Sequence, residues 1–132
     1  MFLDTNIFIY ALKDERGKFK DACKKQLKRV LGGEMKAQTS TLVLNELLYY
    51  FESNQSKEKA LRIFNLILAF KNLEILPIDK NVLLHVAHFS KLGLEASDAY
   101  HAACMKSNGI SVICSYDKGF HGIKGIERQA PK

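Results

Sequence analysis

Short strand-like segments alternate with longer helix-like segments along this chain, and this alternation restricts the fold more than any other feature. Strands are expected at residues 2–3, 35–38, 73–77 and 110–114, with a final edge strand around Ile126. Strands that alternate with helices lie parallel in one sheet, because each helix carries the chain back across the sheet. We therefore predict an α/β fold with a parallel sheet flanked by helices, and a functional site beyond the carboxyl ends of the strands.

The helical segments are recognised by apolar residues that recur every three or four positions. We expect helices over residues 5–12, 19–31, 41–52, 56–70, 79–93 and 97–109. Ser56, Asp79, Ser97 and one of residues 39–41 are suited to cap the helix N-termini. The chain has no repeat, low-complexity tract or linker, so we expect a single domain over residues 1–132.

Composition is that of a globular protein. Of the 132 residues, 47% are hydrophobic and 26% are charged, a balance that supports a core and argues against disorder. No apolar run reaches the roughly 20 residues of a membrane span, and Asp4 lies where a secretory signal needs a basic region. We therefore expect a cytoplasmic protein. The three cysteines have no CxxC spacing, which favours reduced thiols over disulfides or a structural zinc site.

Four acidic residues lie where strand-like or apolar segments meet turns and helices. Asp4 follows the first strand, Asp117 follows the strand ending at Cys114, and Asp98 lies in the first turn of a helix. Glu46 lies within an apolar helical segment, so we expect its side chain to point inward. Taken singly, Asp98 and Asp117 are typical of ordinary helix and turn acids. Together, the four suggest one cluster at the carboxyl edge of the sheet.

Carboxylates gathered in one cleft repel each other, and two unit charges ~4 Å apart cost about 4 kcal/mol at an effective dielectric constant of 20. Protonation or a bound divalent cation relieves this repulsion. An all-oxygen ligand set favours Mg²⁺ or Mn²⁺ over Zn²⁺, and these ions promote phosphodiester hydrolysis. Thr5, Asn6 and Ser115 are placed to hydrogen-bond the carboxylates and orient them.

The segments around these acids resemble the motifs of PIN-domain nucleases, particularly the VapC-type toxins of prokaryotic toxin–antitoxin pairs. The segments are Phe2-Leu3-Asp4-Thr5-Asn6, Asn45-Glu46, Ser97-Asp98-Ala99-Tyr100-His101-Ala102-Ala103 and Ser115-Tyr116-Asp117-Lys118-Gly119-Phe120, in chain order. The resemblance implies a three-layer α/β/α sandwich with a short, mostly parallel sheet, and endonucleolytic cleavage of RNA that depends on Mg²⁺ or Mn²⁺. It assigns catalysis and metal binding to Asp4, Glu46, Asp98 and Asp117, with Ser115 supporting the site. It also implies a homodimer and a cognate antitoxin that covers the cleft.

The histidines are less informative. His101 lies one helical turn after Asp98 and could face the site, but we favour a histidine on the helix surface. His85 and His88 have metal-binding spacing, but no acid or cysteine accompanies them, which favours solvated or partly buried side chains.

The net charge of +6 is consistent with a polyanionic partner. Candidate RNA contacts are Lys18, Lys24, Lys25 and Lys28 along one helix, and Lys118, which together with Lys124 flanks the last acidic position. A basic helix is more often simply a solvated face. The chain has no RNP-like aromatic motif, so sequence-specific base recognition is not predicted.

Two apolar stretches exceed what one helix face needs, namely residues 49–51 and 63–70. They are equally suited to core packing and to a groove for a second copy or an antitoxin.

Two other functions compete with the nuclease. A non-catalytic PIN-like module would bind RNA or protein through its basic surface, but it has no evident need for clustered carboxylates. A phosphatase of the haloacid dehalogenase type also begins with an Asp after a strand. That class has a second Asp two residues later, where this chain has Asn6.

Overall fold

A computed structural model describes all 132 residues. Its centre is a five-stranded sheet in the order β3-β2-β1-β4-β5, and every neighbouring pair is parallel. The strands are β1 (Phe2–Leu3), β2 (Ala37–Ser40), β3 (Leu73–Leu76), β4 (Val112–Cys114) and β5 (Glu127–Gln129). The predicted α/β fold with a parallel sheet is confirmed, including the final edge strand. Both residues of β1 are fully buried, because this strand occupies the middle of the sheet.

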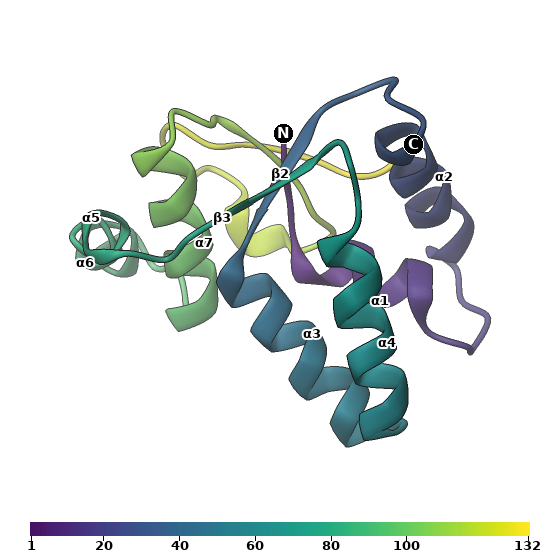
Figure 1. Cartoon of the computed structure of the whole chain (residues 1–132). Coiled ribbons are helices and arrows are strands. Elements are labelled where there is room, and N and C mark those ends of the chain that lie inside the picture. Colours follow the sequence, from purple (N-terminus) through teal and green to yellow (C-terminus); the bar gives the residue numbers. More distant parts are fainter.

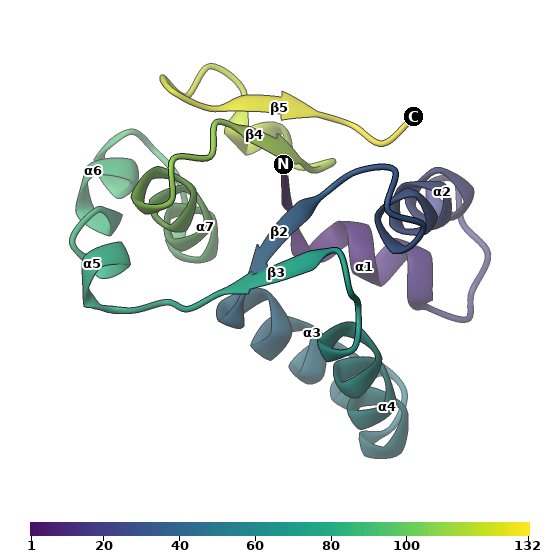
Figure 2. The same ribbon diagram turned by 45° about the horizontal axis from the view of Figure 1, so that its top comes forward.

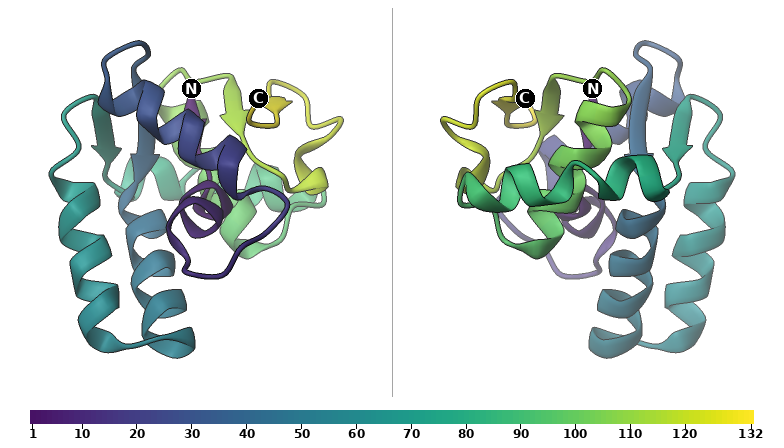
Figure 3. Two further views of the ribbon diagram at one scale, coloured as in Figure 1. Left: turned by 90° about the vertical axis from the view of Figure 1, so that its right-hand side faces the viewer. Right: turned by 90° about the vertical axis from the view of Figure 1, so that its left-hand side faces the viewer.

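Helices cover the two faces of this sheet, which gives the three layers of the predicted sandwich (Figures 1 and 2). They are α1 (Thr5–Leu12), α2 (Lys20–Leu31), α3 (Thr41–Asn54), α4 (Lys57–Leu68), α5 (Lys80–Leu83), α6 (Val86–Lys91) and α7 (Ala96–Ser107), with a short 3₁₀ turn, η1 (Lys118–Phe120). Helices α5, α6 and α7 lie on one face, and α1 and α2 lie on the other. Helices α3 and α4 form a hairpin that projects away from the sheet (Figure 3).

Several boundaries differ from the sequence prediction. Strand β2 begins two residues later than expected, because Ala37 to Ser40 pair residue for residue with Leu73 to Leu76 of β3. Its polar end is buried, with the Thr39 hydroxyl donating to the carbonyl of Leu3 (3.0 Å). Ser40 then caps α3 through its hydroxyl, which accepts a hydrogen bond from the amide of Val43.

The predicted helix over residues 79–93 is two short helices, α5 and α6, that meet around His85. Val82 in α5 and Phe89 in α6 are both buried and keep the spacing of one continuous helix. The sequence pattern therefore did not indicate the break between them. Ser97 is not a cap. The amide of Ala99 donates to the carbonyl of Glu95 (2.8 Å), so α7 begins at Ala96 and Ser97 lies within its first turn.

The predicted reduced cysteines are confirmed, since Cys23, Cys104 and Cys114 are all free and buried. None of the helices is both long enough and apolar enough to cross a lipid bilayer.

Candidate active site at the carboxyl end of the sheet

Asp4 lies directly after the central strand and is fixed there by three donors. The backbone amide of Thr5 donates to its Oδ1 (2.7 Å), and the Ser115 hydroxyl and the Asn6 side-chain amide donate to its Oδ2 (2.5 and 2.9 Å). The Asp4 amide donates to the carbonyl of Cys114 (3.1 Å), which extends the β1–β4 pairing and brings Ser115 alongside. Asp4 is buried, and every one of these donors stabilises its charged form.

Ser115 connects two of the acidic residues. Its hydroxyl donates to Asp4 and accepts from the backbone amide of Asp117 (2.9 Å) and from the Asn6 side chain (3.1 Å). The Asn6 side-chain oxygen in turn accepts from the amide of Tyr116 (3.3 Å). The structure therefore brings Asn6 and Ser115 to the carboxylates, where the sequence placed them.

Glu46 reaches the same region from α3. Its Oε1 accepts from the Thr5 hydroxyl (3.1 Å) and lies 3.0 Å from Nε2 of His101. The Glu46 side chain is 26% exposed, so it points inward but keeps access to solvent. Thr5 is thus placed as predicted, because its backbone contacts Asp4 and its side chain contacts Glu46.

The position of His101 differs from the one expected from the sequence. We favoured a histidine on the helix surface, but the side chain is 1% exposed and faces the acids. Its Nε2 lies 3.0 Å from Glu46 and 3.7 Å from Oδ1 of Asp4. The signal in the sequence was the three-residue spacing from Asp98, which puts both side chains on one face of α7.

Asp98 and Asp117 form a close carboxylate pair beside Gly119. A β-carbon added at Gly119 would lie 3.1 Å from Oδ1 of Asp117 and 3.8 Å from Oδ2 of Asp98. Oδ1 of Asp117 also accepts from the Gly119 amide (2.7 Å). Burial, together with the charge and hydrogen bond of Asp117 and the charge of Asp4, raises the pKa of Asp98 to about 7.

Electrostatics show that negative charge is concentrated here. Burial raises the pKa of Asp4, although the charge of His101 and the hydrogen bonds from Ser115 and Thr5 oppose this. Burial of the His101 ring favours its neutral form, yet its hydrogen bond to Glu46 and the charges of Asp4, Glu46 and Asp98 prevail and raise its pKa. Neighbouring acids with raised pKa values, here Asp4 and Asp98, are typical of a functional site.

The four acids are neighbours, but they do not form a finished metal cage. No three His, Cys, Asp or Glu side chains are arranged as a ready coordination group. Asp4 and Glu46 instead use their oxygens on hydrogen bonds within the protein.

An aromatic cluster that the sequence analysis did not identify supports the site loop. Tyr116 stacks on Phe19 with ring centroids 4.0 Å apart and meets Tyr10 edge-on at 5.7 Å. Because Tyr116 lies between Ser115 and Asp117, these contacts hold the loop against α1 and the residue before α2.

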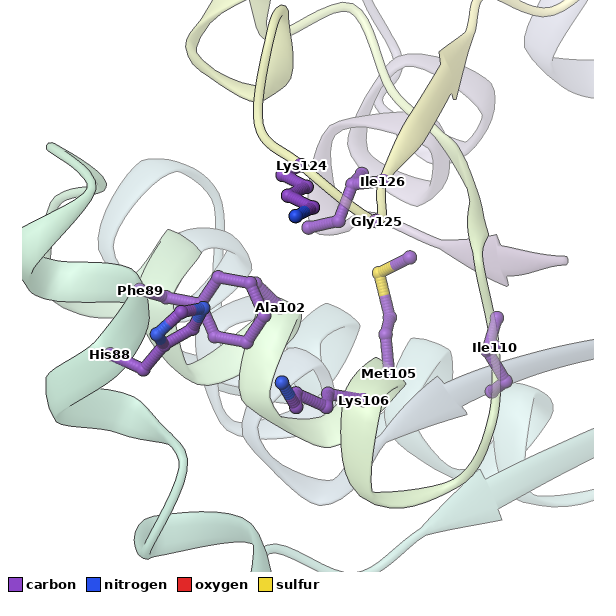
Figure 4. A pocket seen from close by; sticks show the side chains of 9 residues that line it. All are labelled: His88, Phe89, Ala102, Met105, Lys106, Ile110, Lys124, Gly125 and Ile126. Atoms are coloured by element: carbon purple, nitrogen blue, oxygen red, sulfur yellow. The ribbon is translucent and has the colours of Figure 1, made fainter.

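The basic residues are spread over the surface. Lys18, Lys24, Lys25, Lys28 and Lys118 are all exposed, and only Lys118 directly follows a site acid. Lys124, expected near Asp117, instead lines a cavity of about 170 Å³ between α6, α7 and the segment before β5 (Figure 4). Phe89 and Met105 also line this cavity, which contains none of the four acids.

A parallel α/β fold with these acids at its carboxyl edge defines a class of protein, and the sequence comparison agrees. Residues 1–126 match the family model described as PIN domain. The chain belongs to the PIN domain family, as the motifs had indicated. Two curated relatives are the VapC ribonuclease of Mycobacterium bovis and Ribonuclease VapC13 of Mycobacterium tuberculosis. Each is 29% identical over 132 residues, which cover 98% of this chain and 99% of the relative.

Solved structures share the fold at lower sequence identity. VapBC2 from Rickettsia felis, bound to a DNA fragment from its promoter, has a TM-score of 0.75 at 19% identity and covers 99% of this chain and 98% of that one. FitAcB from Neisseria gonorrhoeae has a TM-score of 0.74 at 18% identity, over 98% and 96% of the two chains. VapC20 of Mycobacterium tuberculosis, a sarcin–ricin loop cleaving toxin, has a TM-score of 0.71 at 15% identity over 88% of both chains.

Proposed function

We propose that this protein is an endoribonuclease that hydrolyses RNA phosphodiester bonds with the help of a divalent cation, and that it is the toxin of a toxin–antitoxin pair. The observation that carries the proposal is the meeting of Asp4, Glu46, Asp98 and Asp117 at the carboxyl end of a PIN-domain sheet. The relatives named as VapC ribonucleases support the reaction class. We further propose that residues 1–132 act as one nuclease domain in the cytoplasm.

The chemistry of these side chains fits Mg²⁺ or Mn²⁺. The donors are carboxylates, and no lysine, arginine or histidine side chain forms an ion pair with Asp98 or Asp117. The repulsion between these two carboxylates is therefore left to a proton or a bound cation. Asp4, Glu46 and Asp98 would hold the ion, with Asp117 assisting. When bound, such an ion supplies Lewis-acid chemistry that polarises a phosphodiester and favours deprotonation of a water molecule.

The residues around the acids set their positions before substrate arrives. Ser115 and Asn6 hold Asp4, and the Thr5 hydroxyl holds Glu46. The Gly119 amide holds one oxygen of Asp117. Fixed carboxylates need little rearrangement to bind charge, which is the advantage of a preorganised site. Lys118 directly follows Asp117 and is exposed, so it is suited to contact an RNA phosphate.

The proposed partners are a cognate antitoxin and a second copy of the chain. Exposed apolar side chains occur in two places that suit such contacts. Tyr49, Leu61, Leu66 and Leu68 lie on the α3–α4 hairpin. Leu83 ends α5, Leu84 directly follows α5, and Leu92 directly follows α6. Solved structures that share this fold include a toxin–antitoxin complex from Klebsiella pneumoniae and VapBC-5 of Mycobacterium tuberculosis, a member of the VapBC family of toxin–antitoxin systems, which supports an antitoxin as one partner.

The test is cleavage of a mixed single-stranded RNA pool with Mg²⁺, Mn²⁺ or EDTA. Wild type should cut only with metal and leave 5′-phosphate ends, which separates it from contaminating nucleases that leave cyclic phosphates. Asp4→Asn should lose roughly 100-fold or more of the activity, because several kcal/mol of charge stabilisation depend on the ion. Asp21→Asn, an exposed acid on α2, is the matched control and should cut like wild type. Metal-independent cutting, or full activity of Asp4→Asn, would refute the proposal. RNA binding without cutting would favour a binding module.

A further inference from the structure

The buried imidazole of His101 joins two helices at the acidic site. We propose that His101 is a positioning residue whose Nε2–H holds Glu46 in place for the cation. This inference rests on the proposed function, because it assumes that Glu46 takes part in binding the ion. It adds a residue to the four acids and the three supporting residues Thr5, Asn6 and Ser115.

The contact geometry identifies Nε2 as the hydrogen-bearing nitrogen. Nε2 lies 3.0 Å from Oε1 of Glu46 and 3.7 Å from Oδ1 of Asp4, and both of these atoms are acceptors. Nδ1 of the same ring is buried and has no hydrogen-bond partner. If only Nδ1 carried a hydrogen, that donor would be unsatisfied, and the lone pair of Nε2 would point toward two carboxylates. Both effects are costly in a buried site.

The ring is held in this orientation by its surroundings. His101 is 1% exposed, and its ring centroid lies 5.7 Å from that of Phe2 on the central strand. Alanines at positions 99, 102 and 103 of α7 are fully buried, so this part of the helix lies in the packed interior. A ring fixed by packing can orient the carboxylate that it contacts.

Glu46 needs such a contact more than Asp4 or Asp117 does. Asp4 and Asp117 accept backbone hydrogen bonds from Thr5 and Gly119, whereas Glu46 accepts only from side chains. Its side chain is 26% exposed and longer than that of aspartate, so it has more freedom to turn into solvent. Thr5 and His101 are the two groups that oppose this, one from α1 and the other from α7.

The decisive comparison is between His101→Met and His101→Gln. The two replacements have nearly the same length and shape, but only glutamine keeps an N–H donor. We expect His101→Met to raise the Kd for Mn²⁺ by about 10- to 100-fold, the usual effect of losing a group that orients a metal ligand. His101→Gln should restore most of that affinity. The same two changes at the exposed His88 are the matched controls and should leave the Kd unchanged.

The Kd is read from the electron paramagnetic resonance signal of free Mn²⁺, without RNA, and folding is checked by thermal melts. In cleavage assays the Mn²⁺ concentration for half-maximal rate should rise by the same factor in His101→Met, while KM for RNA stays unchanged. In a Glu46→Gln background, His101→Met should add little, because the two side chains act as one unit.

Each outcome decides the matter. Equal Mn²⁺ affinity in wild type and folded His101→Met would overturn the inference, and so would equal losses in the Met and Gln variants, which would indicate packing alone. A wild type that binds no Mn²⁺ would overturn the proposed metal-dependent function, and this inference with it. If His101→Met does not fold, nitrogen NMR of the wild-type imidazole decides instead: hydrogen on Nε2 supports the inference, and hydrogen on Nδ1 alone refutes it.

Discussion

The carboxylates of Asp98 and Asp117 lie against the same side of Gly119, at 3.8 and 3.1 Å from the position its β-carbon would occupy. One belongs to the first turn of α7 and the other to the loop after β4, so the fold itself forces two negative charges together. The absence of a side chain at residue 119 leaves room for both. Such a pair is unfavourable in the protein alone and becomes favourable when a proton or a cation is shared.

This relationship predicts how the stability of the metal-free protein depends on pH. The pKa of Asp98 rises from 3.8 to about 7 on folding, so between these values the folded state binds more protons than the unfolded state. Stability should therefore fall as pH rises through this window. Asp98→Asn removes the cost of holding a charged carboxylate at this position. The change should therefore raise Tm at pH 8 but hardly at pH 4. Asp21→Asn, measured in parallel in EDTA, should show no such difference, and an equal gain at both pH values would contradict the argument.

Added metal should reverse this loss of stability. A ligand that binds only the folded state stabilises it by about 2.7 kcal/mol at 100 times its Kd. We expect Mn²⁺ to raise the Tm of wild type at pH 8, and to do so less at pH 5, where protons compete for Asp98. Asp4→Asn should lose most of the Mn²⁺ effect at both pH values. A Tm that EDTA and Mn²⁺ leave unchanged would argue against a cation at these carboxylates.

Ser115→Ala should lower both the stability and the activity of the protein. The change removes the donor to Asp4 and the acceptor of the Asp117 amide, so we expect a loss of about 1–3 kcal/mol in the free energy of unfolding. Cleavage should fall by roughly 10- to 100-fold, since Asp4 loses its orientation. Ser40→Ala is the matched control. It removes the buried cap of α3 at about 1 kcal/mol and should leave the cleavage rate unchanged.

Much of this architecture could be read from the sequence, because local patterns determine it. Asp4 and Asp117 follow strands whose apolar runs are short and distinct, and parallel strands bring their carboxyl ends to one edge. The break between α5 and α6 was missed because Val82 and Phe89 keep helical spacing across it. The start of β2 was misplaced because its pairing with β3 buries Thr39, a polar residue that gives no apolar signal.

His101 and Tyr116 were misjudged or missed for a different reason. Their roles depend on contacts between elements distant in the chain, such as His101 with Glu46 and Tyr116 with Phe19. Helical spacing placed His101 on the face of Asp98, but it could not show that α3 would cover that face with a carboxylate. Tertiary contacts of this kind require the fold before they can be predicted.

The apolar residues 49–51 can now be divided by burial. Phe51 is fully buried, whereas Tyr49 is 73% exposed on the α3–α4 hairpin. Phe51→Ala should lower the free energy of unfolding by about 3–5 kcal/mol, and Tyr49→Ala should change it by no more than about 0.5 kcal/mol. Urea unfolding measures both values. If Tyr49→Ala is strongly destabilising, this side chain belongs to the core and is not available to a partner.

Lys118 is the basic residue that we expect to matter most for RNA binding, because it directly follows Asp117 at the carboxyl edge of the sheet. Lys118→Gln in an Asp4→Asn background, which binds RNA without cutting it, should reduce the slope of log affinity against log salt by about one unit. The control is Lys71→Gln, since Lys71 is exposed and precedes β3 at the opposite, amino edge. Fluorescence anisotropy with a labelled RNA at several salt concentrations gives both slopes. A larger change in the Lys71 variant than in the Lys118 variant would mean that RNA does not approach along the acidic edge.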